Sequence, residues 1–280
     1  TGDNNVAVGY AALDAEDTGT DSVAIGYNAL TAQNNDAANY NVAVGSSAGA
    51  AVSSGTANTI IGGLAGDALT TGSNNVAIGL SALSTDDVGS RSVAVGSNAL
   101  ESQNTATAAN VYNTAVGYGA GAAVTTGTLN TFVGGLAGDA LTTGTDNVAV
   151  GYQALSADTL GRHSVAIGDV ALSSQNFTTD TASNNTAVGH EAGNGITTGI
   201  RNTLMGAHAG DALTDADENT AIGALALTSD TLGSKSTAIG RGALLSQNFT
   251  TATDAHNTAV GYYAGNQVTT GVSNVLVGSL

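Results

Sequence analysis

The sequence predicts an all-β fold: a parallel β-solenoid (a β-roll or β-helix) of sixteen coils, in which each coil contacts mainly its neighbours. A five-residue motif recurs sixteen times: Asn or Ser, then Val or Thr, then usually Ala, then an aliphatic residue, then Gly. Apolar side chains alternate within the motif, which is typical of a β-strand. Most copies lie 17 residues apart, a spacing too short for a helix, a strand and two turns.

Each coil is expected to begin with a short strand that ends at the motif glycine. A turn, a second short strand around Ala-Leu or Ala-Gly, and a polar return loop complete the coil. Glycine at the corner supplies a backbone conformation without a Cβ atom that would clash. Asn at the start of the motif can hydrogen-bond the backbone, and stacked copies predict a ladder of side-chain amides. The chain contains no Pro, as expected if every coil donates ladder hydrogen bonds to the next.

A longer period groups the coils in fours. The motif glycines follow one another at 17, then 19 or 21, then 17 and 17 residues. The residue four positions after each glycine follows the order Leu, Leu, Gly, Gly, and the residue two before it is larger than Ala in every fourth coil. We expect a single repeat solenoid, a segment of a longer fibre, with four units at residues 1–70, 71–142, 143–214 and 215–280.

Alanine occupies most copies of the central strand position. Because Ala buries little apolar area, a thin coil of this kind encloses a small core. An Ala-lined face also allows another chain to approach closely. We therefore expect oligomerisation to complete the core.

The composition excludes several classes of function. Lys and Arg total 5 and Asp and Glu total 22, which gives a net charge of −17 and excludes a nucleic-acid binder that neutralises phosphates. The absence of Cys excludes disulfides and thiolate metal sites. No apolar run approaches the ~20 residues of a membrane span, so this segment is not expected to insert into a membrane. The four His are scattered and no His–carboxylate–Ser set recurs, so we do not expect an enzyme.

Four copies of the motif resemble a known family: residues 22–26 (SVAIG), 92–96 (SVAVG), 164–168 (SVAIG) and 236–240 (STAIG). They are similar to the head repeat of trimeric autotransporter adhesins of the YadA type. Other coils, such as residues 113–138, are similar to the shafts of phage tail fibres. The resemblance implies a left-handed parallel β-roll with three chains around one axis. It also implies an extracellular location, on a cell surface or virion, and attachment to a cell-surface glycan or protein.

The second coil of each unit carries extra residues, at 31–40, 101–112, 173–184 and 245–256. Insertions in a solenoid map to loops on one face, which is often the binding face. The candidates for receptor contact are Gln33, Gln103, Gln175, Gln247, Tyr40, Tyr112, Phe177 and Phe249. Four such loops would repeat one weak contact along the chain. The alternative is that these loops brace neighbouring subunits. A further position, directly after the motif glycine, is often Tyr but varies widely, which indicates exposure to solvent.

Acidic residues recur in two columns. One column holds Glu16, Asp86, Asp158 and Asp230, and the other holds Asp67, Asp139 and Asp211. We expect a solvated acidic stripe that keeps a fibre soluble. No metal site is predicted and no cofactor is expected, although carboxylates and loop carbonyls could bind Ca²⁺, with Asp67, Asp139 and Asp211 as weak candidates.

The expected function is a structural shaft or head segment of a homotrimeric extracellular fibre, belonging to a phage or a bacterium, that attaches to a cell surface. Two alternatives remain open: a calcium-stabilised scaffold without receptor binding, and an ice-binding solenoid. Ice binding is the weaker of the two, because Thr precedes the motif glycine by three residues in eight coils but no Thr-x-Thr array forms.

Overall fold

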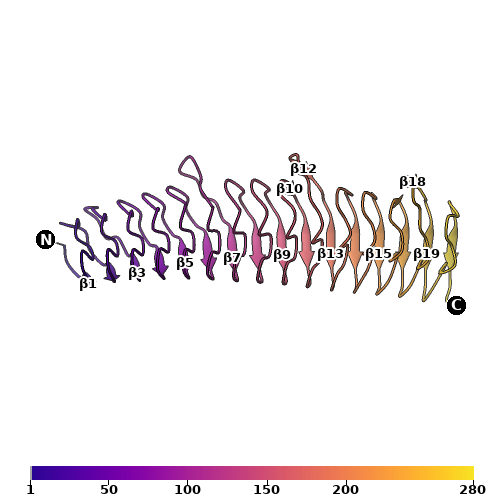
Figure 1. The fold of residues 1–280 in the computed structure, drawn as a ribbon, viewed down its shortest axis with the longest axis horizontal. Coiled ribbons are helices and arrows are strands. Elements are labelled where there is room, and N and C mark those ends of the chain that lie inside the picture. Colours follow the sequence, from indigo (N-terminus) through magenta and orange to yellow (C-terminus); the bar gives the residue numbers. More distant parts are fainter. Residues whose placement is uncertain (1) are drawn as a thin grey trace. The chain divides into compact units, whose positions relative to one another are not determined.

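Each copy of the five-residue motif forms a three-residue β-strand that ends directly before the motif glycine. The computed structural model describes residues 2–280, and this part of the chain contains no helix, hence none that could cross a membrane. The fold is an all-β parallel β-solenoid (Figure 1). It divides between Thr143 and Gly144 into two compact units of eight coils each.

In the first unit, eight strands form one parallel sheet in sequence order. They are β1 (Val6–Val8), β2 (Val23–Ile25), β3 (Val42–Val44), β4 (Thr59–Ile61), β5 (Val76–Ile78), β6 (Val93–Val95), β7 (Thr114–Val116) and β8 (Thr131–Val133). The register places equivalent motif residues opposite each other, as in Ala24 with Ala43 and Ala94 with Ala115. The predicted strand and its parallel stacking are therefore confirmed.

The second unit repeats this ladder. Its eight strands are β9 (Val148–Val150), β11 (Val165–Ile167), β13 (Thr186–Val188), β14 (Thr203–Met205), β15 (Thr220–Ile222), β17 (Thr237–Ile239), β19 (Thr258–Val260) and β20 (Val275–Val277). Two-residue strands also pair in parallel outside the ladder: β10 (Gly161–Arg162) with β12 (Thr181–Ala182), and β16 (Gly233–Ser234) with β18 (Thr253–Asp254).

The central residue of each inner ladder strand points into the coil. It is fully buried in all three-residue strands of the ladder except the two end strands, β1 and β20. The Ala three residues after the motif glycine is also buried in nearly all coils, as in Ala29 and Ala154. The expected Ala-lined interface is thus corrected: the Ala face is this chain's own core, because a narrow coil has room inside only for small side chains.

The four-coil period comes from packing across neighbouring coils. Phe132 is fully buried in a fourth coil, where most other coils have Ala. A Cβ built on Gly121 would lie 2.7 Å from the Phe132 ring, and one on Gly138 would lie 2.3 Å from it. Ile60 and Leu204 fill the same position between glycines in their own units. The order Leu, Leu, Gly, Gly therefore exists because two glycines make room for one large side chain.

The segment after the motif glycine differs from expectation. It is a turn rather than a second strand, because residues two and four positions after the glycine adopt positive φ, as in Ala11 (50°) and Leu13 (55°). Extended backbone cannot contain such residues. The turns still stack on one another, since the N–H of Leu13 donates to the carbonyl of Ala29 at 3.0 Å.

The predicted ladder of side-chain amides is present inside the coils. Asn58 is fully buried; its Nδ2 donates to the carbonyl of Gly72 at 2.9 Å, and its Oδ1 accepts from the N–H of Asn75 at 3.0 Å. Each Asn therefore satisfies backbone groups of its own return loop and of the next coil. The motif glycine is required for a similar reason: at Gly62 (φ +136°) a Cβ would lie 2.4 Å from the carbonyl oxygen of Gly79.

Candidate functional site

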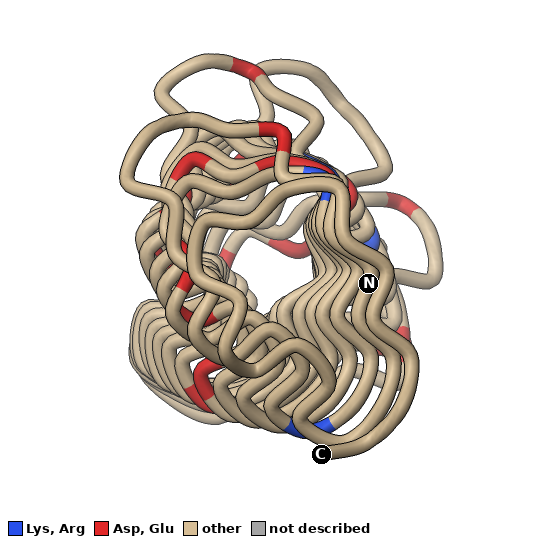
Figure 2. Tube along the Cα trace, turned by 90° about the vertical axis from the view of Figure 1, so that its right-hand side faces the viewer, with Lys and Arg blue, Asp and Glu red and all other residues tan. Residues whose placement is uncertain are grey.

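The loops of the second coils project from the solenoid, at the end of the coil away from the strand ladder (Figure 1, near β12 and β18). In the second unit they carry the pairs β10–β12 and β16–β18. Their tips are exposed, as at residues 178–180 and 250–252. Figure 2 shows acidic residues on these loops as well as on the coils. Exposed tips at repeated positions are the part of each loop that an external partner can reach.

The four glutamines expected to contact a receptor lie inside the coils. Gln103 is fully buried, and its Nε2 donates to Asp86 Oδ2 at 2.6 Å and to Ser92 Oγ at 3.0 Å. Its Oε1 accepts from Asn113 Nδ2 at 2.9 Å. The glutamine thus bridges the gap that the short Ser leaves in the amide ladder, which explains why Ser and Gln always occur together in the second coil.

The same network recurs around the equivalent residues. Members of this fully buried column are Gln33, Gln103, Gln175 and Gln247. Because a side chain in the core has no surface for an external partner, the expectation of receptor contact is corrected for all four: they connect successive coils.

The two phenylalanines are internal as well. Phe177 and Phe249 are only 5% and 6% exposed. Their backbone N–H groups donate to Asp158 Oδ1 at 3.1 Å and to Asp230 Oδ1 at 2.9 Å. They hold the base of the loop against the core, so their expected contact with a receptor is corrected too.

Only the two tyrosines of the predicted set are exposed. Tyr40 is 63% exposed and Tyr112 is 45% exposed, with its hydroxyl 2.6 Å from Arg91 Nη1. Both stand five residues before a motif glycine, at positive φ, and the equivalent residues in the other two loops are Asn184 and His256. The sequence interpretation missed Asn184 and His256 because it selected the loop residues by aromatic type. Their distance of five residues from the motif glycine was the signal that could have found them.

One acidic column is buried, contrary to the expected solvated stripe. Asp86, Asp158 and Asp230 are fully buried, whereas Glu16 is partly exposed. Burial raises the pKa of Asp158, while hydrogen bonds from Gln175 and from backbone N–H groups oppose that rise. These carboxylates are acceptors inside the loop base, because several donors converge on each of them.

The other acidic column holds the weak metal candidates. Asp67 and Asp139 are half-buried, each has an Oδ1 atom without a hydrogen-bond partner, and desolvation raises the pKa of both. Asp211 differs, since its Oδ1 accepts from Thr228 Oγ1 at 2.5 Å and its Oδ2 lies 3.3 Å from His208 Nδ1. The three residues therefore do not share one environment.

The raised pKa of Asp67 and Asp139 gives a pH prediction. The folded state holds these two protons more tightly than the unfolded state. The stabilisation of the folded state by these protonated carboxyls is therefore complete below the ordinary pKa of 3.8. It is lost as the pH rises through the raised pKa of the folded state. We expect D67N/D139N to show a smaller gain in urea midpoint than the unmodified chain as the pH falls from neutral toward the ordinary value of 3.8.

A carboxyl whose pKa shifts in the opposite direction provides the control. Lys235 donates to Asp254 and lowers the pKa of that carboxyl. The stabilisation of the folded state by ionised Asp254 is therefore present at neutral pH and is lost on acidification. D254N should leave the stabilisation on mild acidification intact. Equal pH dependence of D67N/D139N and the unmodified chain would contradict the assignment.

The outward face of the strand ladder is uncharged and is lined by Val, Ile, Met and Thr side chains. In all sixteen motifs the residue before the glycine is Val, Ile or Met, and the residue two positions earlier is Val or Thr. Well inside the ladder these side chains remain accessible: Ile61 is 38% exposed and Met205 is 43% exposed. No charged residue occurs at any of these positions, although the chain carries a net charge of −17. The tyrosines after the motif glycines border this face and are exposed, as the sequence predicted.

Comparison of the chain with protein-family models, with curated proteins and with solved structures finds no match. The class of protein is therefore defined by geometry: a β-solenoid repeat protein with an uncharged aliphatic sheet face and repeated projecting loops.

Proposed function

We propose that this chain is a structural segment of an extended extracellular fibre, in which three left-handed solenoids associate and attach to a cell surface. The observation that carries the proposal is the uncharged aliphatic face of the strand ladder. An uncharged face with a continuous column of exposed aliphatic side chains is typical of an interaction surface. A second and third copy of the same chain are the proposed occupants.

The pattern of charge supports association through this face. Acidic residues outnumber basic ones 22 to 5, yet the two outward strand columns contain none of them. Depletion of charge at the centre of a surface is the compositional signature of interfaces. Side chains such as Ile222 and Ile239, exposed on neighbouring strands, would bury their remaining apolar area against another chain.

The loops support the attachment role. Their exposed tips recur once in every four coils, and three chains would present each of them three times. Repeated weak contacts raise the overall affinity because later contacts form at high effective concentration. A glycan or protein of a cell surface is the proposed partner, and a phage tail fibre or a bacterial adhesin the proposed owner.

Sedimentation equilibrium of the 280-residue chain, with and without a chelator, tests the assembly. We expect a mass three times 27.0 kDa in both conditions. The double variant I222K/I239K places two charges on the outward face and should shift the mass toward that of one chain, because a buried unpaired charge is costly. A trimer that dissociates only with chelator would favour the calcium-stabilised scaffold instead.

A matched control adds the same two charges elsewhere. Thr250 and Thr251 lie on an exposed loop tip of the same unit, so T250K/T251K should retain the trimer. A folded single chain at all concentrations, or a trimer that I222K/I239K leaves intact, would refute association through this face.

A further inference from the structure

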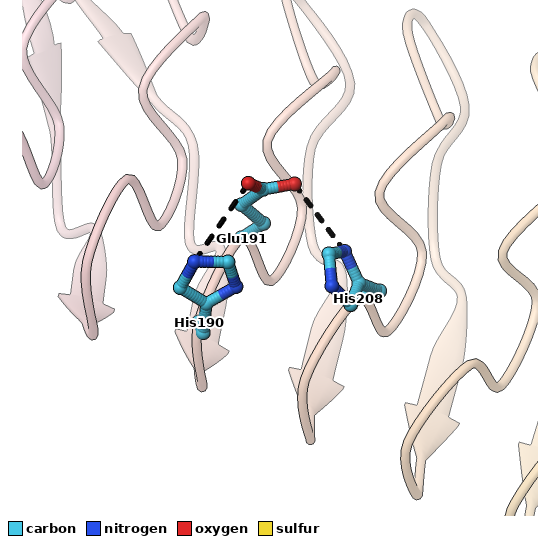
Figure 3. Close-up of side chains that lie close together, drawn as sticks. All are labelled: His190, Glu191 and His208. Carbon is cyan, nitrogen blue, oxygen red and sulfur yellow. Dashed lines mark ion pairs between the residues drawn. The ribbon is translucent and has the colours of Figure 1, made fainter.

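Two histidines and a glutamate come together on the surface of the second unit. His190 and Glu191 lie in the turn after β13, and His208 lies in the turn after β14. Figure 3 shows the Glu191 carboxylate between the two imidazole rings, with one oxygen toward each ring. Glu191 Oε1 is 3.7 Å from His190 Nε2, and Glu191 Oε2 is 3.3 Å from His208 Nδ1.

Two further carboxylates flank this cluster. Asp211 Oδ2 lies 3.3 Å from His208 Nδ1, and Asp169 Oδ2 lies 3.4 Å from His190 Nε2. One ligand atom from each of His190, Glu191 and His208 can be chosen so that all three lie within 4.8 Å of one another. In the described residues this is the one group of three or more such side chains that could hold a metal ion.

The backbone of the solenoid places these side chains side by side. Glu191 and His208 each stand two residues after a motif glycine, both at positive φ (54° and 56°), and therefore occupy the same column on successive coils. Asp169 and His190 are likewise neighbours in the column directly after the motif glycine. Elsewhere these two columns hold mainly Tyr, Ser, Asn, Leu and small residues. Metal-ligating side chains thus gather at one place in a molecule that otherwise repeats itself.

We propose that His190, Glu191, His208 and Asp211 form a binding site for a divalent transition-metal ion of the zinc class. Two imidazoles and two carboxylates complete a four-coordinate set. With metal–ligand distances of about 2.0–2.2 Å, ligand atoms around a tetrahedral ion lie roughly 3.3–3.5 Å apart. The distances of Glu191 and Asp211 to His208 Nδ1, 3.3 Å each, match that spacing, and the distance of Glu191 to His190 Nε2 is slightly longer at 3.7 Å.

The nature of the ligands selects the ion. Imidazole nitrogen suits Zn²⁺, Cu²⁺, Ni²⁺ and Co²⁺, whereas Ca²⁺ and Mg²⁺ prefer sets of oxygen ligands. The site therefore differs in chemistry from the calcium alternative considered for Asp67, Asp139 and Asp211, and of these three residues only Asp211 takes part. The bound ion would connect two successive coils of one chain.

Titration calorimetry with Zn²⁺ and the visible absorption of bound Co²⁺ test the site on the full 280-residue chain. Physiological ionic strength and excess Mg²⁺ suppress non-specific attraction to the acidic surface. We expect one Zn²⁺ per chain and, with Co²⁺, the intense bands of a tetrahedral site. The stoichiometry per chain is the same whether or not the chains associate, so the outcome does not depend on the proposed trimer.

The columns themselves supply variants that preserve the fold. Asn98 and Gln153 already occupy the column of Glu191 and His208, and Ser97 occupies that of His190. We therefore expect E191Q, H208N and H190S to fold normally and to weaken Zn²⁺ binding by about tenfold or more. His163, which lies 3.8 Å from Asp146 outside the cluster, gives the control H163N, and this variant should bind as the unmodified chain does.

Three results would overturn the proposal: no uptake of Zn²⁺ or Co²⁺, uptake that E191Q and H208N leave unchanged, or displacement of Zn²⁺ by Ca²⁺ at similar concentration. Loss of binding in the three variants, with H163N unaffected and circular dichroism unchanged, would establish it.

Discussion

Replacement of Phe132 by Ala is expected to destabilise the first unit by about 3–5 kcal/mol, the range typical of a large aromatic side chain removed from a core. Phe132 is fully buried and is the largest such side chain in the described residues. Its ring lies over Gly121 and Gly138, which have no side chains to fill the space that F132A would leave. A coil this narrow also has few neighbours that could move inward. The loss should appear as a lower urea midpoint with an unchanged slope.

A leucine at the same position is the matched control. Leu204 occupies the equivalent position of another four-coil unit, so F132L should cost less than F132A, on the order of 1–2 kcal/mol. The complementary variant G138A places a Cβ 2.3 Å from the Phe132 ring and should destabilise the chain on its own. In F132A/G138A the clash disappears, so the two effects should not add. Additive losses would show that the glycine and the phenylalanine are not coupled.

Replacement of Asp158 by Asn is expected to destabilise the second unit by about 2–3 kcal/mol through unsatisfied buried donors. Asp158 Oδ1 accepts from the N–H groups of Gly161 at 3.0 Å and Phe177 at 3.1 Å, and Oδ2 accepts from Gln175 Nε2 at 2.6 Å. Asn offers only one acceptor oxygen, so its NH₂ group must face at least one of these donors and leave it without an acceptor. Gln175 cannot turn to compensate, because its Oε1 already accepts from Asn185 Nδ2 at 2.9 Å.

The expected loss at Asp158 is limited by an opposing effect. Burial raises the pKa of its carboxyl, so removing the charge recovers part of the desolvation cost. The surface variant D180N is the control, because Asp180 is exposed and pairs with Arg162 at 3.2 Å on the surface; its effect should stay within ~1 kcal/mol. Urea unfolding at fixed protein concentration, at about pH 7, measures the stability loss of both variants, D158N and D180N. A D158N midpoint equal to that of D180N would show that the network contributes nothing.

The sequence by itself determined the repeat, the position of each strand of the ladder and the ladder of side-chain amides. These follow from local rules: alternation predicts a strand, glycine marks a position without room for a Cβ, and stacked Asn residues hydrogen-bond along the chain. The exposed position after the motif glycine was predictable as well, because a column that accepts Tyr, Asp, His and Arg cannot be internal.

Only the tertiary structure decided which of the two strand faces is the core and which polar columns are internal. The alternation of side chains alone does not show which face of the strand points into the coil, since both the Ala face and the Val face are apolar. Gln103 and Asp86 belong to residue types that are mostly exposed, and they are buried only because they satisfy each other and the amide ladder. The cluster of His190, Glu191 and His208 was equally hidden, because neighbouring columns become spatial neighbours only once the register between coils is fixed.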